Sequence, residues 1–550
     1  MEKQHDKHTP IHPKAKRQLQ KSGATLINAT EHRQEHETWD RRTFLKMTGL
    51  TALGNSMLLG STPVQAFSPN ALLNSLALDN CGDRILVLIR LKGGNDGLNT
   101  IIQRGDDIYY NIRPSIATTE ANLWGLSDEY GMPNELIDLQ PLWEGGRMKV
   151  IHNVGYPNPN YSHFRSSDIW ASASASNEIE TTGWLGRWLY QDLPAFLTAP
   201  PVVPPALQIG IQANMLFRAE VGNLALAISN PAEFYQIAQS GSLYETGLLG
   251  NAPNEQELKY VRTVANSAFR YSESIQAAYN AGNNQVAYPD NYLAEQLAIV
   301  ARMIKGNLGT KVYMVSIDGF DTHNAQLDLH PLLLNYLGSS IAAFFNDLDA
   351  SGHSPNVLGM TFSEFGRTIY ENASQGTDHG TGAPLFLFGN ELGSTFHGES
   401  PNLAEVDQYG DPRFSVDFRS VYTNVLRNWL CAPQEVTDHI LGDELEMLED
   451  LLPATEAPVG SREVAILLGH NPADVPGVAF ELKFAIQQRG VARISILNKA
   501  GQAIRMVFNQ FMERGSHTFI FKPNDFFLSS GEYFYRLEAG GRAYTRAIVW

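Results

Sequence analysis

The chain has 550 residues, a length that predicts two or three domains with enough apolar core to fold without disulfide staples. Hydrophobic residues make up 43% and charged residues 18%, a composition that excludes disordered, coiled-coil and collagen-like proteins. The 41 Lys+Arg against 58 Asp+Glu give a formal net charge of -17, so we expect no nucleic-acid partner, because most of the surface would repel a polyanion.

Residues 1–66 are predicted to be a twin-arginine signal peptide with an extended n-region. Arg41 and Arg42 precede a moderately apolar stretch at 47–59, and Ala66 is the expected cleavage position. The alternative is that this stretch is a first transmembrane helix. Its polar and glycine residues make it poorly suited to cross a membrane, so we expect that the protein is not an integral membrane protein. The twin-arginine translocase is the expected partner, and it carries folded proteins that often hold a metal.

Short apolar runs predict strands that are buried on both faces of a sheet. They span residues 84–91, 311–317 and 356–362, and each stops at polar or glycine residues. Apolar residues at helical spacing lie between them, at 254–281, 292–305 and 330–348. Strands that alternate with helices predict a largely parallel α/β sheet, with ligands bound at the carboxyl ends of the strands.

Polar clusters follow the first two strands. After the first strand, a Gly-Gly pair permits a sharp turn, and Asp96 could point its carboxylate out of the sheet edge. The alternative is a turn in which Asn95 and Asp96 satisfy their own backbone. After the second strand, Asp318, Asp321 and His323 offer the oxygen and nitrogen donors that zinc or manganese sites need, unless they form a solvated turn.

The third strand and one loop add further candidates. Arg367 is suited to clamp an anion, and the adjacent Asp378 and His379, in a glycine-flanked loop, can ligate one ion. Ser162 precedes a predicted helix, where it is either an N-cap or, beside a metal, a hydroxyl that can be deprotonated to act as a nucleophile. Together these clusters predict a metal site.

The composition changes after about residue 452. Prolines and a glycine predict a linker at 458–473, which ends an α/β domain at 67–457. At 474–550, short alternating strands separated by turn signals predict a small immunoglobulin-like β-sandwich. A long-range disulfide between Cys81 and Cys431 is left open.

The order and spacing of the clusters resemble a known family. The matching stretches are Gly93–Asn99, Ser162–Phe164, Trp184–Arg187, Asp321–His323, Phe362–Thr368, Gly376–Gly380 and Val416–Arg419. They are similar to the bacterial exported family called domain of unknown function 1501, which is placed in the alkaline phosphatase and sulfatase superfamily. The resemblance implies a three-layer α/β/α sandwich of alkaline phosphatase type, and a metal-dependent hydrolase of phosphate or sulfate esters with Ser162 as its nucleophile.

The resemblance also implies two divalent metal ions, with Zn, Mn and Ca not distinguished. One ion would be surrounded by Asp96, Ser162, Asp378 and His379. The other would be held by His323 with Asp321, Asp318 or both, and His397 is a substitute for a further histidine of the superfamily. Asn95 and Arg367 would bind the nonbridging oxygens of the substrate. The alternatives are a non-catalytic cell-surface binding or structural protein and a calcium-stabilised scaffold.

The C-terminal module resembles the sorting domain of type IX secretion. The stretches that carry the resemblance are His470–Pro472, Val491–Gly501, Arg514–Thr518 and Leu528–Arg536. The resemblance implies the type IX secretion machinery as a partner and a location at the cell surface or outside the cell, with the periplasm as the second choice. A generic immunoglobulin-like appendage is the alternative.

Overall fold

The computed structural model describes residues 84–193, 203–239 and 271–453, apart from a few short gaps, and isolated strands elsewhere. These strands lie at 57–64, where β1 (Met57–Leu59) pairs with β2 (Thr62–Val64), and between 465 and 549. The twin-arginine motif and Cys81 lie outside the described residues, so the signal peptide stays a prediction. Cys431 is disulfide-bonded. Within the described ranges, no helix combines the length and apolar character that crossing a membrane would need.

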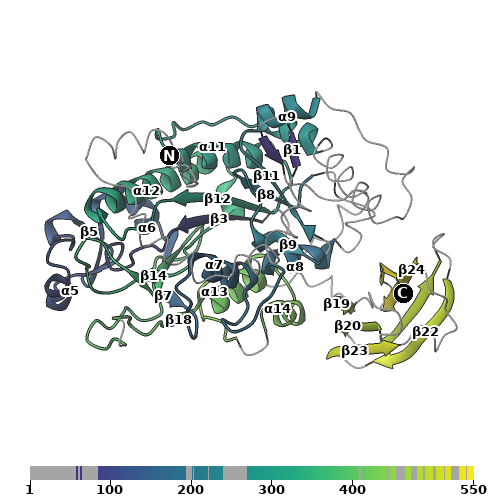
Figure 1. Cartoon of the computed structure of the whole chain (residues 1–550). Coiled ribbons are helices and arrows are strands. Elements are labelled where there is room, and N and C mark those ends of the chain that lie inside the picture. The colour runs from purple at the N-terminus through teal and green to yellow at the C-terminus, as the bar shows by residue number, and fades with distance from the viewer. Residues whose placement is uncertain are drawn as a thin grey trace, which may run out of the picture.

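A sheet of nine strands forms the centre of the α/β domain (Figure 1). Its order is β11-β8-β12-β3-β13-β16-β7-β17, and β18 also pairs with β7. The strands are β3 (Ile85–Lys92), β7 (Met148–Gly155), β8 (Ala206–Ile209), β11 (Ala225–Ile228), β12 (Val312–Asp318), β13 (Val357–Phe362), β16 (Ala383–Phe388), β17 (Phe396–His397) and β18 (Val416–Asp417). Among these strands only β16 runs antiparallel to its neighbours. The prediction of a largely parallel sheet is therefore confirmed.

Helices cover both faces of this sheet (Figure 1). One face carries α11 (Tyr292–Lys305) and α12 (Gln326–Ala350). The other carries α7 (His163–Ser172), α8 (Trp184–Asp192), α13 (Phe418–Asn424) and α14 (Gln434–Leu441). This arrangement is the three-layer α/β/α sandwich that the family resemblance implies.

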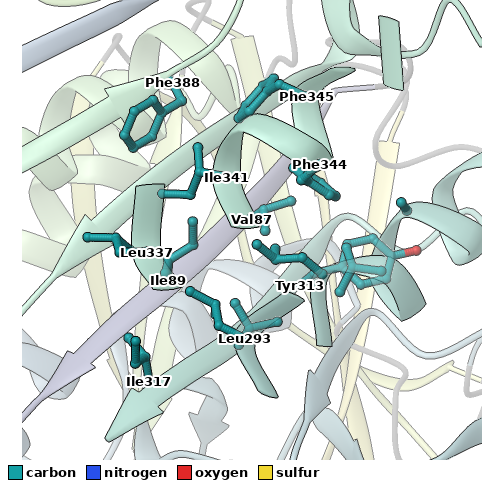
Figure 2. Packing of buried hydrophobic residues seen from close by; sticks show 14 of the residues in the cluster. Val87, Ile89, Leu293, Tyr313, Ile317, Leu337, Ile341, Phe344, Phe345 and Phe388 are labelled. Atoms are coloured by element: carbon teal, nitrogen blue, oxygen red, sulfur yellow. The ribbon is translucent and has the colours of Figure 1, made fainter. Parts of the chain in front are cut away.

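Each face of the sheet has its own hydrophobic core. Because side chains alternate along a strand, Val87 and Ile89 of β3 pack on one side, and Leu86 and Leu88 pack on the other. Figure 2 shows α12 side chains such as Ile341 lying over Val87 and Ile89. Burial of each such side chain contributes about 1.5–3 kcal/mol, so the two cores hold the strand ends in fixed positions.

The predicted elements agree with the structure to within a few residues. The helix predicted at 292–305 is α11, and the one predicted at 330–348 lies inside α12. Residues 271–281 are helical, whereas most of the rest of the helix predicted at 254–281 lies outside the described residues. Smaller elements are β4 (Ile102–Gln103), α5 (Asp107–Ile112), β5 (Leu123–Gly125), β6 (Tyr130–Pro133), α6 (Gln140–Glu144), β9 (Arg218–Ala219), β10 (Gly222–Asn223), α9 (Pro231–Gln239), β14 (Gly366–Arg367) and β15 (His379–Gly380).

The C-terminal strands form two sheets, with the orders β19-β20-β23 and β22-β21-β24-β25. Their bounds are β19 (Ala465–Asn471), β20 (Phe480–Ile486), β21 (Gly490–Leu497), β22 (Ala503–Met512), β23 (Gly515–Phe521), β24 (Glu532–Ala539) and β25 (Arg542–Val549). Phe484 from one sheet and Ile494 from the other belong to the same buried cluster. β19 lies in the predicted linker, so the module begins before residue 474. The apolar run of β19, Ala465–Leu468, is only four residues long and lies in the stretch assigned to the linker.

Candidate metal centre

The predicted polar clusters meet at one edge of the central sheet. β3, β12 and β13 run parallel, so the residues that follow them emerge at the same carboxyl edge. β7 is parallel to these strands and leads toward Ser162 and His163. β16 runs in the opposite direction, so the residues that precede it, including His379, also lie at this edge.

Two glycines let the loops at this edge approach one another. Gly93 has a φ of 123°, and a Cβ atom there would lie 2.3 Å from the backbone nitrogen of Asp321. At Gly376 a Cβ atom would lie 2.3 Å from the carbonyl carbon of His323. A side chain at either position would therefore push the Asp321–His323 loop out of place.

The side chains of His163, Asp321, His323 and His379 converge; we call this group the four-ligand centre. Asp321 Oδ1 lies 3.4 Å from His163 Nε2, 3.3 Å from His323 Nε2 and 3.3 Å from His379 Nε2. The Nε2 atoms of His323 and His379 are 2.9 Å apart. Three chain segments, namely the segment after β7, the loop after β12 and the segment before β16, thus bring three imidazole nitrogens around one carboxylate oxygen.

The opposite ring nitrogen of each histidine contacts a hydrogen-bond acceptor. The Nδ1 contacts are His163 to Glu364 Oε1 at 3.0 Å, His323 to Asp378 Oδ1 at 2.9 Å and His379 to the Tyr161 carbonyl at 2.8 Å. Since a carbonyl and an ionised carboxylate only accept, these partners assign the proton of each neutral ring to Nδ1. Each Nε2 lone pair then faces the centre, which is how metal-binding histidines are commonly oriented.

The spacing and chemistry of these atoms can hold a metal ion. The ligand atoms of His163, Asp321 and His379 all lie within 4.8 Å of one another, and His323 approaches Asp321 and His379. Ligands about 2.0–2.1 Å from a tetrahedral zinc ion lie about 3.3–3.4 Å from one another, the separations that Asp321 makes with the three rings. The shorter contact between His323 and His379 would bring two lone pairs together unless a cation or a proton lay between them. Three imidazoles and one carboxylate suit zinc and related transition metals better than calcium, which prefers oxygen ligands.

The charges of the centre are strongly coupled. Burial by itself would raise the pKa of Asp321, but the rings of His163 and His379 and the Arg367 guanidinium hold this pKa far below its usual range. Burial lowers the pKa of His379 to about 4. Burial opposes protonation of His163 too, yet the carboxylates of Asp321 and Glu364 raise its pKa to about 9. Without a metal ion, His163 therefore carries a proton at neutral pH.

Glu364 and His163 also contribute to the centre, although neither is among the site residues predicted from the sequence. Glu364 is 1% exposed, and its Oε1 atom also accepts a hydrogen bond from the Gly93 backbone at 2.9 Å. Burial would raise the pKa of Glu364, but the contact with His163 and the charge of Arg90 lower it to about 2. The available signals were the position of Glu364 directly after a buried strand and that of His163 directly after Ser162.

The residues predicted from the sequence separate into groups. Asp321, His323 and His379 belong to the four-ligand centre, and Asp378 contacts it through His323 Nδ1. Arg367 Nη2 lies 2.8 Å from Asp321 Oδ1. The same guanidinium donates to backbone carbonyls of Gly93, Gly94, Phe320 and Thr377. Arg367 thus fixes Asp321 and the surrounding loops.

Other predicted residues lie apart from this centre. Asp96 forms a buried ion pair with Arg113 at 2.7 Å, and Asn95 contacts His330 at 3.0 Å. Asp318 pairs with Lys92 at 2.9 Å. His397 lies in β17, where its ring is 3.4 Å from Lys149 Nζ. Their roles as metal ligands or substrate-binding residues stay predictions.

Ser162 is half-buried at the N-cap of α7, where its side chain makes no capping hydrogen bond. Its backbone nitrogen donates to Asn160 Oδ1 at 2.9 Å. The preceding residue, Tyr161, accepts from His379, and the following residue is His163. The backbone on both sides of Ser162 is therefore anchored to the four-ligand centre.

The sequence matches the family described as "Protein of unknown function (DUF1501)" over residues 150–450. The chain belongs to this family. No curated protein matches it.

Solved structures with some similarity include three proteins of low sequence identity. A protein in the alkaline phosphatase superfamily from Vibrio parahaemolyticus is 9% identical, with 82% of this chain and 85% of that chain covered and a TM-score of 0.28. The PsFucS1 sulfatase from Pseudoalteromonas sp. is 12% identical, with 84% and 89% covered and a TM-score of 0.31. The phosphonate monoester hydrolase SpPMH from Silicibacter pomeroyi is 8% identical, with 85% and 89% covered and a TM-score of 0.30.

Proposed function

We propose that this protein is an exported, metal-dependent hydrolase of phosphate or sulfate esters with Ser162 as its nucleophile. The observation that carries the proposal is the convergence of three imidazole Nε2 atoms on Asp321 Oδ1. A divalent ion in this place would polarise an ester oxygen and lower the pKa of a nearby hydroxyl. His163, Asp321, His323 and His379 would hold the ion.

The surrounding residues have separate tasks. Glu364, Asp378 and the Tyr161 carbonyl orient the three rings through Nδ1, so that the Nε2 lone pairs are kept in position. The Ser162 hydroxyl does not cap α7, and it stands at the amino end of a ten-residue helix. The partial positive charge of that helix end favours both an anionic ester group and a deprotonated serine.

Metal content and turnover test this proposal on the full chain. We expect wild type to retain a transition metal by elemental analysis and to hydrolyse aryl phosphates or aryl sulfates. His323→Ala should lose the metal, whereas His353→Ala is a matched control, because the His353 ring contacts Ser351 and not the centre. Ser162→Ala should keep the metal and lose activity by a factor on the order of 10⁴ to 10⁶.

Two results would contradict the proposal. The first is a folded wild-type protein that binds no transition metal. The second is a Ser162→Ala variant that hydrolyses the same esters at the wild-type rate. A loss of metal in His353→Ala as well would show that the assay reports general misfolding and not ligation.

One observation favours a second candidate, a non-catalytic surface protein that keeps the ion. Asn95 and Arg367, the predicted substrate-binding side chains, are both buried and hydrogen-bonded to other parts of the protein. A metal-loaded protein without turnover on either ester class, whose midpoint of thermal unfolding falls on chelation, would support this candidate.

The proposals for export rest on the sequence. Replacement of Arg41 and Arg42 by lysine should retain the protein in the cytoplasm, if the twin-arginine translocase exports it. Removal of residues 458–550 should shift the protein from the cell surface to the periplasm, if the C-terminal strands serve type IX secretion. Cell fractionation measures both results.

A further inference from the structure

A second cation is already built into the protein, where it contacts the segments that follow β3 and β13. Arg113 follows α5 and is fully buried. Its guanidinium donates to four acceptors in two segments: Asp96 Oδ2 at 2.7 Å, Asn99 Oδ1 at 2.9 Å, the Thr368 carbonyl at 2.8 Å and the Ile369 carbonyl at 2.7 Å. The positive charge of Arg113 is thus held in place on all sides by the fold.

The Asp96 carboxylate is committed to these contacts. Oδ2 accepts from Arg113 and from the Gln326 side-chain amide, and Oδ1 accepts from the Leu98 backbone nitrogen at 3.2 Å. Asp96 and Gln326 are both fully buried. A metal ion at Asp96 would have to displace these donors and would also meet the Arg113 charge inside the protein.

The family resemblance implies that Asp378 and His379 bind the same ion as Asp96. In the structure both residues make contacts at the four-ligand centre instead. Asp378 Oδ1 contacts His323 Nδ1 at 2.9 Å, which makes it an orienting group for that ring. The Nε2 atom of His379 lies 2.9 Å from His323 Nε2, inside the four-ligand centre. Of the ligands implied for two ions, Asp378 and His379 thus belong to the four-ligand centre, whereas Asp96 binds the Arg113 guanidinium.

We propose that the protein binds one metal ion and that Arg113 permanently supplies the second positive charge at the Asp96 position. The inference rests on the proposed function, because the one ion is the ion of the four-ligand centre. Unlike a metal ion, the guanidinium cannot be removed by a chelator. Arg113 also binds the carbonyls of the two residues after Arg367, so it holds the segment that positions Asp321.

The stoichiometry of the metal tests this inference. The full chain is loaded with excess Zn²⁺, dialysed, and measured by elemental analysis together with Asp96→Asn and Asp321→Asn. We expect about one equivalent in wild type, one in Asp96→Asn and none in Asp321→Asn. Circular dichroism establishes that each variant is folded.

A spectroscopic measurement on wild type keeps the test valid if Asp96→Asn does not fold. X-ray absorption of the zinc-loaded protein should give nitrogen and oxygen neighbours without a second zinc scatterer. Two-metal hydrolytic sites have their ions about 3.5–4 Å apart, so a zinc scatterer at that distance would overturn the inference.

The outcomes separate this inference from the proposed function. Two equivalents in wild type, or loss of the ion in folded Asp96→Asn, would overturn the single-ion inference and leave the hydrolase proposal intact. No zinc in folded wild type would overturn both. One equivalent that survives Asp96→Asn and is lost in Asp321→Asn supports both.

Discussion

Two polar regions lie at the same edge of the sheet, and they compensate buried negative charge in opposite ways. In the Asp96–Arg113 region the protein supplies its own cation, and both side chains are 0% exposed. In the four-ligand centre, the side chains of His163, His323 and Asp321 remain 17%, 25% and 26% exposed. Only the second region combines converging lone pairs with partial access to solvent, which a metal ion from solution requires. A carboxylate at a strand end therefore indicates a metal site only when the side chains around it are known to be ligands and not a cation of the protein.

The largest effect should come from breaking the Asp96–Arg113 pair. Arg113→Ala leaves Asp96 buried without its partner, and such a change destabilises proteins by about 3–5 kcal/mol. Urea unfolding measures the difference. Arg104→Ala is the control, because its pair with Glu120 is 37% and 48% exposed, and it should cost at most about 1 kcal/mol. Equal losses in both variants would show that burial of the Asp96–Arg113 pair adds nothing to its contribution to stability.

Removal of the metal should destabilise the centre and leave the Asp96–Arg113 region unaffected. A ligand present at a hundredfold its Kd stabilises the folded state by about 2.7 kcal/mol, so chelation should lower the free energy of unfolding by about that amount. In His323→Ala the chelator should have almost no effect, because the ion is already absent. Hydrogen exchange at residues 96–101 should be the same with and without chelator.

In the metal-free protein, stability should fall on both sides of neutral pH, and only the four-ligand centre should contribute to the alkaline loss. His163 has its pKa raised to about 9, so its contribution to stability is present below pH 6.5 and is lost as the pH rises to 9. Burial lowers the pKa of His330, beside Asn95, to about 4, so stability is lost as the pH falls from 6.5 to 4. Each of these two losses lowers the free energy of unfolding by an amount on the order of 2–3 kcal/mol.

Denaturant titrations at pH 5, 6.5 and 9 measure these changes. Metal loading should remove the alkaline loss, because a ligating His163 is neutral at every pH at which the ion is bound. His330→Gln should reduce the acid loss without abolishing it, because the lowered pKa of His379 contributes to the same loss, and it should leave the alkaline loss unchanged. A metal-loaded protein that still loses stability between pH 6.5 and 9 would argue against His163 as a ligand.

The smallest effect should come from Asp318. Its pair with Lys92 is 29% exposed on the aspartate and 37% on the lysine, so Asp318→Asn should change stability by less than about 1 kcal/mol. The metal content should stay at the wild-type value, since Asp321 already supplies a carboxylate to the centre. Loss of metal in this variant would return Asp318 to the set of candidate ligands.

Much of the architecture could be predicted because it depends on local patterns. The apolar runs that form β3, β12 and β13 are short, continuous and ended by glycine or polar residues. Fully buried strands of parallel sheets have this pattern, and α11 follows from its helical spacing. β19 was not predicted because its apolar run, Ala465–Leu468, is only four residues long and lies in the stretch assigned to the linker.

The candidate site was only partly predictable, because ligation depends on partners far away in the sequence. Asp321, His323 and His379 could be chosen from their types and their positions after strands. Glu364 and His163, by contrast, come together across 201 positions of the chain. Nothing near His163 in the sequence signals the carboxylate that fixes its ring.

The sequence by itself determined the layered α/β fold, the edge of the sheet at which polar residues gather, and the family. These properties follow from hydrophobic periodicity and from motifs within single segments. Only the tertiary structure decided which carboxylates belong to which cation. Asp96 lies 17 positions before Arg113, with α5 between them, and the intervening chain must fold back before their charges meet. The pairing of buried charges is set by distance and burial in three dimensions, which residue type and spacing do not encode.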